Sequence, residues 1–195
     1  MRQVAIIGLA DSTHGDAPYL DPDWELWGLP WDEERWLYFD RLFDIHPLEC
    51  IKEAIPSFYQ PDYLSRLKSL EYPLYMQKAY SDIPNAIEYP LEEVSALVGD
   101  YYNSSIAYML AMAIFEKVDK IGVWGVDMSG PGEPGHANEY RDEKPNCEYL
   151  LGFAKARGIE IYLPEKCPLL KFSGIFPLGK VIPNYDKRYG FLAVE

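Results

Sequence analysis

The sequence predicts an α/β fold with one mainly parallel β-sheet between two layers of helices. Short apolar runs of strand length alternate along the chain with segments of helical character, which is the pattern of βαβ units. The runs are continuously apolar rather than alternating, as expected for strands covered on both faces. Residues 104–117 are apolar nearly all round, which predicts a helix buried against such a sheet.

Six segments are expected to be strands of this sheet. The clearest are the runs VAIIGLA near the N-terminus and IGVWGV in the second half of the chain. Aromatic and β-branched residues support the others. The six predicted strands are residues 4–10, 24–29, 36–45, 73–77, 121–126 and 159–163, and residues 85–89 form a further extended piece.

Helices are expected between these strands. A helical stretch over residues 48–70 is interrupted by prolines, and residues 91–98 form a short helix that Gly99 ends. Pro145 is interpreted as a first-turn proline of a helix that runs to Arg157. Residues 171–195 are expected to be irregular.

The bulk composition fits one domain, residues 1–195. The chain has 195 residues, of which 48% are hydrophobic and 25% are charged, close to the average of folded globular proteins. The net charge of −13 argues against a duplex DNA or RNA partner, because such a surface repels phosphate backbones. A small nucleotide remains possible, since local backbone N–H groups can hold a phosphate in an acidic protein.

The sequence favours a cytoplasmic protein that does not span a membrane. No apolar run approaches the roughly 18 residues of a membrane span, and the N-terminus lacks the features of a signal peptide. The three cysteines are far apart and odd in number, which is typical of free thiols. No Cys/His pair has the spacing of a zinc site. The oligomeric state is left open.

Polar side chains follow several of the predicted strands. Because the carboxyl ends of parallel strands lie at one edge of a sheet, where open α/β sheets bind ligands, these side chains are expected to meet in one crevice. The crevice is expected to join Ser12, His14, His46, Ser104 and Asp127.

Two segments are candidates for phosphate binding. The loop GLADSTHG matches neither G-x-G-x-x-G nor a Walker loop, yet Gly8, Ser12 and Thr13 could supply N–H and hydroxyl donors. The alternative is an ordinary polar loop. The triplet 103–105, made up of Asn103, Ser104 and Ser105, precedes the apolar helix, where it could cap the helix or bind an anion at its positive end.

Histidine is the side chain best suited to proton transfer near neutral pH, and His14 and His46 both end predicted strands. Asp44 lies two residues before His46 and could orient its ring. The alternative is a structural turn that contains a satisfied histidine. His136, in a loop of Gly, Pro and Ala, is either a lid residue or exposed.

Asp127 ends a wholly apolar strand, so its carboxylate is expected to be partly desolvated and to need a partner. It could cap a turn, accept a sugar hydroxyl or hold Mg²⁺ through water. Of the aromatic residues, which are mostly expected in the core, Trp27, Trp31 and Tyr140 are placed where they could stack on a base. The candidate catalytic residues are thus His14, His46 and Asp127.

The stretch SSIAYMLAMAIFEKVDKIGVWGVDMSG resembles the C-terminal half of a Rossmann-like family. That family includes archaeal-type hydroxymethylpterin diphosphokinases and related sialyltransferase-like proteins. The matching positions are Ser104, Ser105, Gly125 and Asp127. The chain departs from the family at its first loop, which reads GLADSTHG in place of a Gly-x-Gly-Pro-Ser-Leu pattern. WELWGLPW, LFDIHP and CEYLLGFAKARGIEIYLP further resemble small proteins of tailed phages, over about residues 3–170.

The resemblance implies a nucleotide- or nucleotide-sugar-binding transferase, phage-encoded and located in the host cytoplasm, with Mg²⁺ as the candidate cofactor that accompanies the nucleotide. Two alternatives stay open. The protein could be a module that binds or sequesters nucleotides without turnover, or a phage interaction protein that keeps only the fold.

Overall fold

The computed structural model describes residues 1–31, 39–54, 61–128 and 139–171. Its centre is one seven-stranded sheet in the order β5-β4-β3-β2-β1-β6-β7. Every pairing between neighbouring strands is parallel. The strands are β1 (Gln3–Ile7), β2 (Trp24–Gly28), β3 (Arg41–Phe43), β4 (Leu74–Met76), β5 (Ala86–Glu88), β6 (Lys120–Trp124) and β7 (Glu160–Tyr162).

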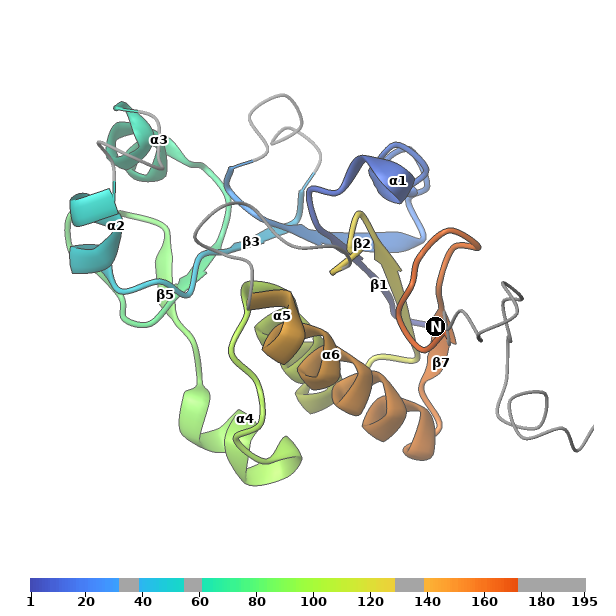
Figure 1. Cartoon of the computed structure of the whole chain (residues 1–195). Coiled ribbons are helices and arrows are strands. Elements are labelled where there is room, and N and C mark those ends of the chain that lie inside the picture. Colours follow the sequence, from blue (N-terminus) through green and yellow to red (C-terminus); the bar gives the residue numbers. More distant parts are fainter. Residues whose placement is uncertain (32–38, 55–60, 129–138, 172–195) are drawn as a thin grey trace, which may run out of the picture.

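The helices form a layer on each face of the sheet, so the predicted three-layer, Rossmann-like α/β fold is confirmed. α4, α5 and α6 lie on one side in Figure 1, and α1 and α3 lie on the other. The helices are α1 (Asp11–His14), α2 (Leu48–Ala54), α3 (Tyr63–Ser69), α4 (Leu91–Val98), α5 (Ser105–Phe115) and α6 (Glu139–Ala156).

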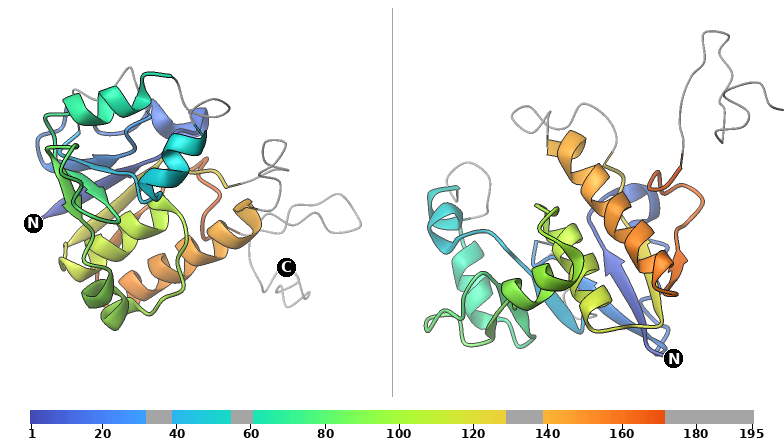
Figure 2. Two further views of the ribbon diagram at one scale, coloured as in Figure 1. Left: turned by 90° about the vertical axis from the view of Figure 1, so that its left-hand side faces the viewer. Right: turned by 90° about the horizontal axis from the view of Figure 1, so that it is seen from below.

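Alternate residues of the strands supply the two halves of the core. In β1, Val4 and Ile6 pack with α5 and α6, whereas Ala5 and Ile7 pack with α2 and α3. α5 and α6 lie side by side along their face of the sheet (Figure 2). Burial on both faces explains why these strands read as continuously apolar.

The structure corrects three predicted boundaries. β3 has only three residues where residues 36–45 were expected, and residues 32–38 lie outside the described part of the chain. The polar loop expected after β1 contains the single-turn helix α1. α6 begins six residues before Pro145, because residues 139–144 are mostly good helix formers and the proline removes only one hydrogen bond, to the carbonyl of Arg141.

An ion-pair network joins the amino ends of β1, β2 and β3 to α5. Arg2 contacts Glu25 at 2.8 Å and Glu116 at 2.5 Å, and Arg41 contacts the same two carboxylates at 2.8 and 2.7 Å. Burial alone would raise the pKa of Glu25, but hydrogen bonds from Trp27 and Arg2 and the charge of Arg41 outweigh it and lower that pKa. The amino edge is therefore occupied by charges that satisfy one another.

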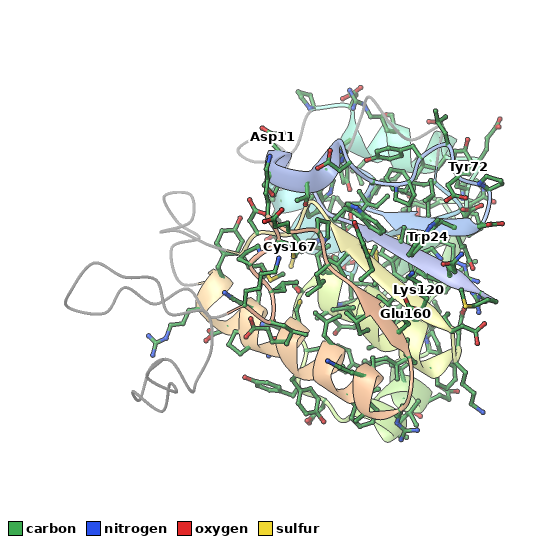
Figure 3. All side chains as sticks on the ribbon, turned by 90° about the vertical axis from the view of Figure 1, so that its right-hand side faces the viewer. Asp11, Trp24, Tyr72, Lys120, Glu160 and Cys167 are labelled. Carbon is green, nitrogen blue, oxygen red and sulfur yellow. The ribbon has the colours of Figure 1, made fainter. Side chains whose placement is uncertain are left out.

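The two edges of the sheet are distinct in Figure 3. Trp24, Lys120 and Glu160 begin β2, β6 and β7 and lie at the amino edge, whereas Asp11 and Cys167 lie at the opposite end. All three cysteines are free, and Cys147 and Cys167 are buried. No helix in the described part of the chain is long and apolar enough to cross a membrane.

Candidate functional site

The strand order places a topological switch point between β1 and β6. From β1 the chain builds the sheet outward through β2, β3, β4 and β5, and then returns through α4 and α5 to add β6 on the other side of β1. In open α/β sheets, ligands bind at the carboxyl edge at such a point. The loops after β1 and β6 are therefore the first place to look for a site.

Two glycines allow these loops to meet. Gly8 N donates to the carbonyl of Trp124 at 2.9 Å, and Ala10 N donates to the carbonyl of Gly125 at 2.8 Å. Gly125 has φ of +63°, and its N–H donates to Thr13 Oγ1 at 2.8 Å. Because the Gly8 N–H and the Thr13 hydroxyl oxygen are engaged inside the protein, both residues shape the loop rather than face a ligand.

Replacing Gly8 with alanine is expected to destabilise the fold and to separate the two loops. A Cβ at Gly8 would lie 2.4 Å from the carbonyl oxygen of Gly125, and this backbone cannot move without breaking the bonds described above. The expected loss in unfolding free energy is at least about 1–3 kcal/mol, measured by urea denaturation.

The matched control is Gly152→Ala, because nothing lies within 4 Å of a Cβ at that position in α6. There the extra methyl group should stabilise the helix, by up to about 1 kcal/mol. Equal effects of the two substitutions would contradict the close-approach explanation.

A side-chain hydrogen bond spans the switch point. The hydroxyl of Ser12, in α1, donates to Oδ1 of Asp127, which follows β6. Both side chains are half-buried, and the next residue, Met128, has φ of +42°. A left-handed conformation is uncommon for methionine and marks a local backbone constraint beside the carboxylate. Ser12 is thus the partner that the partly desolvated carboxylate was expected to need.

A second polar group lies at the carboxyl end of β3, two strands from β1. The side chain of Asp44 is wholly buried, and its Oδ1 lies 2.7 Å from Nδ1 of His46. The hydroxyl of Tyr63, in α3, donates to Oδ2 of Asp44 at 2.8 Å. The His46 side chain is 43% exposed, and the ring of Trp31 lies against it with centroids 5.5 Å apart. The arrangement is a histidine held by a buried carboxylate at the carboxyl edge of the sheet.

His14 has a different environment. It is buried, and the Tyr19 hydroxyl lies 3.0 Å from its Nδ1. The ring is thus enclosed by the protein, in contrast to that of His46. Of the two histidines expected to act as a base, only His46 is substantially exposed.

The predicted residues around α5 and α6 lie at the same edge. Ser104 is the N-cap of α5, and its hydroxyl accepts from Ala107 N at 3.3 Å. Asn103 is exposed, whereas Ser105 and Tyr140 are half-buried. Capping thus accounts for Ser104, and of the three residues only Asn103 is exposed.

Burial raises the pKa of the Cys147 thiol, although a hydrogen bond with Ser104 opposes this effect. A buried thiol of this kind is inert rather than nucleophilic. His136 lies outside the described residues. In the described ranges, no group of three or more His, Cys, Asp or Glu side chains could hold a metal ion.

Sequence reasoning did not identify Tyr63 or the reciprocal packing of Gly8 and Gly125. Tyr63 is 19 residues from Asp44, in another element, and no local pattern relates the two. Gly125 carried a signal, since a glycine that interrupts an apolar strand suggests a close backbone approach.

Neither a scan of protein-family models nor a search of curated proteins finds a match. Solved structures do match. The sialyltransferase CstII from Campylobacter jejuni, in complex with the substrate analogue CMP-3FNeuAc, aligns with a TM-score of 0.53 and 16% identity, over 86% of this chain and 81% of that chain. A mutant α-2,3/8-sialyltransferase CstII aligns with a TM-score of 0.53 and 16% identity, over 98% of this chain and 100% of that chain. CstII in complex with trisaccharide acceptor and CMP aligns with a TM-score of 0.50 and 16% identity, over 86% of this chain and 82% of that chain.

These similarities show a shared fold. They are consistent with the Rossmann-like resemblance in the sequence. The phage origin, the cytoplasmic location and the likeness to diphosphokinases stay predictions from the sequence.

Proposed function

We propose that this protein is a transferase that binds a nucleotide or nucleotide sugar across the carboxyl edge of the sheet. The observation that carries the proposal is the Ser12–Asp127 pair at the switch point between β1 and β6. The held histidine His46 lies on the same edge, at the end of β3. Adjacent strands are about 4.8 Å apart, so β3 and β6 are separated by roughly 14 Å. This distance allows the nucleotide donor to bind near Asp127 and the acceptor to bind near His46.

The comparisons support this choice of ligand. The matching CstII structures are complexes with CMP, a CMP-linked substrate analogue or a trisaccharide acceptor. The match covers 86% of this chain and 81% of that chain at 16% identity, and it supports a shared fold. We extend nucleotide-sugar binding to this chain on that basis.

The donor phosphate is placed next to the N-terminus of α5. The helix dipole favours an anion there, and Asn103 and Ser105 add polar side chains. Asp127 would accept hydroxyl groups of the ribose, because a carboxylate offers acceptors only. Trp31 and Tyr140 are the candidates for stacking on the base.

Asp127 also fits Mg²⁺, which commonly binds one protein carboxylate together with phosphate oxygens and water. Such an ion would neutralise phosphate charge. The proton transfer assigned to His46 does not depend on this ion.

His46 is assigned as the general base. Its ring accepts the proton of an acceptor hydroxyl as that oxygen forms a bond to the transferred carbon. The bond from this carbon to the phosphate oxygen breaks, and the nucleotide leaves with the electron pair. The buried Asp44 carboxylate stabilises the imidazolium that results. The proton then returns to solvent.

The test is ligand binding to the full chain, followed by turnover. CMP and CMP-3FNeuAc are titrated in thermal-shift and calorimetric experiments, with UMP and AMP as comparison nucleotides. A ligand at about 100 times its Kd should add roughly 2.7 kcal/mol to the unfolding free energy. Failure of all four nucleotides to bind would overturn the proposal.

Binding without turnover across a panel of nucleotide sugars and hydroxyl acceptors would favour a nucleotide-sequestering module instead. That outcome retains the nucleotide site and removes the assignment of His46 as a base.

A further inference from the structure

The buried carboxylate of Asp44 is held from two sides. Its Oδ1 is 2.7 Å from His46 Nδ1 and accepts from the His46 backbone N–H at 3.3 Å. Its Oδ2 accepts from the Tyr63 hydroxyl at 2.8 Å. A buried carboxylate is costly unless its oxygens are hydrogen-bonded, and here both are.

We propose that Tyr63 is a positioning residue for His46. By holding Oδ2, the Tyr63 hydroxyl turns Oδ1 toward the imidazole and fixes which ring nitrogen carries the proton. The role of His46 in a reaction rests on the proposed function. The geometry of the contacts among Tyr63, Asp44 and His46 does not depend on it.

The tautomer follows from the chemistry of the partners. A carboxylate accepts hydrogen bonds and donates none, so the imidazole nitrogen that faces it must carry the hydrogen. In the neutral ring, Nδ1 is then protonated and Nε2 has a lone pair. A base needs that lone pair directed away from Asp44. The 43% exposure of the His46 side chain allows this direction.

Trp31 and Tyr63 restrain the His46 ring in different ways. Trp31 packs against the ring with an interplanar angle of 35°, which restrains its plane. The Tyr63 hydroxyl donates to Asp44 and acts on the ring through this carboxylate. Loss of the Tyr63 hydroxyl would leave Oδ2 buried without its donor, so the carboxylate would turn to share its remaining donors between both oxygens. The hold on Nδ1 would weaken while the ring stays in place.

The test is the ¹⁵N NMR signature of His46 in the full chain, which requires no substrate. Spectra are recorded at increasing pH until the ¹⁵N shifts no longer change, so that the ring is neutral. The chain has three histidines, and a His46→Asn variant identifies the signals of His46. The wild type should show a protonated Nδ1 and a bare Nε2.

Tyr63→Phe should shift the tautomer ratio toward Nε2–H by roughly three- to tenfold, the size of one ordinary hydrogen bond, because the lost hydroxyl acts on the ring only through Asp44. Asp44→Asn should shift it further, because the amide can present a donor to Nδ1. The control is Tyr80→Phe. The Tyr80 hydroxyl instead accepts from the backbone N–H of Leu48, two residues after His46. That variant should leave the ratio unchanged.

A wild-type spectrum dominated by the Nε2–H tautomer would overturn the proposal, whether or not the variants fold. So would an unchanged ratio in a folded Tyr63→Phe variant, or an equal shift in Tyr80→Phe. Failure of nucleotides to bind would remove the proposed function and leave these NMR outcomes as they are, so the two failures are distinguishable.

Discussion

His46→Asn is expected to lower the rate of group transfer by about 10²–10⁴-fold, the usual contribution of a positioned general base. Asparagine can still donate from its amide to Oδ1 of Asp44, so the buried carboxylate keeps a partner. It has no nitrogen lone pair of suitable basicity. The fold and the nucleotide affinity should therefore survive while turnover falls. The measurement is kcat with saturating donor, together with the donor Kd from calorimetry.

The companion variant is His14→Asn, at the other histidine that follows a strand. Because His14 is buried beside Tyr19, this change should lower the melting temperature. It should leave kcat per folded molecule close to that of the wild type. If His14→Asn abolishes turnover in a folded protein and His46→Asn does not, the base has been assigned to the wrong histidine.

The fold could be predicted because its central strands are covered on both faces. The run VAIIGLA is apolar at successive positions since Val4 and Ile6 enter one half of the core and Ala5 and Ile7 the other. The strand predicted over residues 36–45 is longer than β3, which covers residues 41–43. Aromatic residues before Arg41 gave a strand-like pattern, although the ladder includes only residues 41–43. Propensity thus identifies which segments are strands better than where they end.

The positions of polar residues at the carboxyl edge could also be predicted, because parallel strands bring their following loops to one side. Contacts between particular side chains could not. The contact between Asp44 and His46 is local, because the two residues are two positions apart, although both follow the end of β3 rather than lying within a strand. The Tyr63–Asp44 and Ser12–Asp127 bonds join residues 19 and 115 positions apart, and their formation depends on how helices and loops pack.

Asp127→Asn is expected to leave the fold intact and to weaken nucleotide binding by about 1–3 kcal/mol, or roughly 5- to 150-fold in Kd. The amide oxygen of asparagine can still accept from the Ser12 hydroxyl, so the link across the switch point is retained. The other position of the side chain becomes a donor where ribose hydroxyls or a cation require an acceptor. The measurement pairs a melting curve with calorimetric titration of CMP.

Asp119→Asn is the matched control, because it removes the same charge from the opposite end of the same strand. Asp119 is exposed at the amino edge, where its carboxylate accepts from Arg2 N at 2.6 Å. If the net charge of −13 governed affinity, both variants would bind CMP more tightly, since each removes one negative charge. If Asp127 contacts the ligand, only its variant binds more weakly. An Asp127→Asn protein with wild-type affinity would leave the Ser12–Asp127 pair as a structural connection between β1 and β6, and the nucleotide would have to be placed elsewhere on the edge.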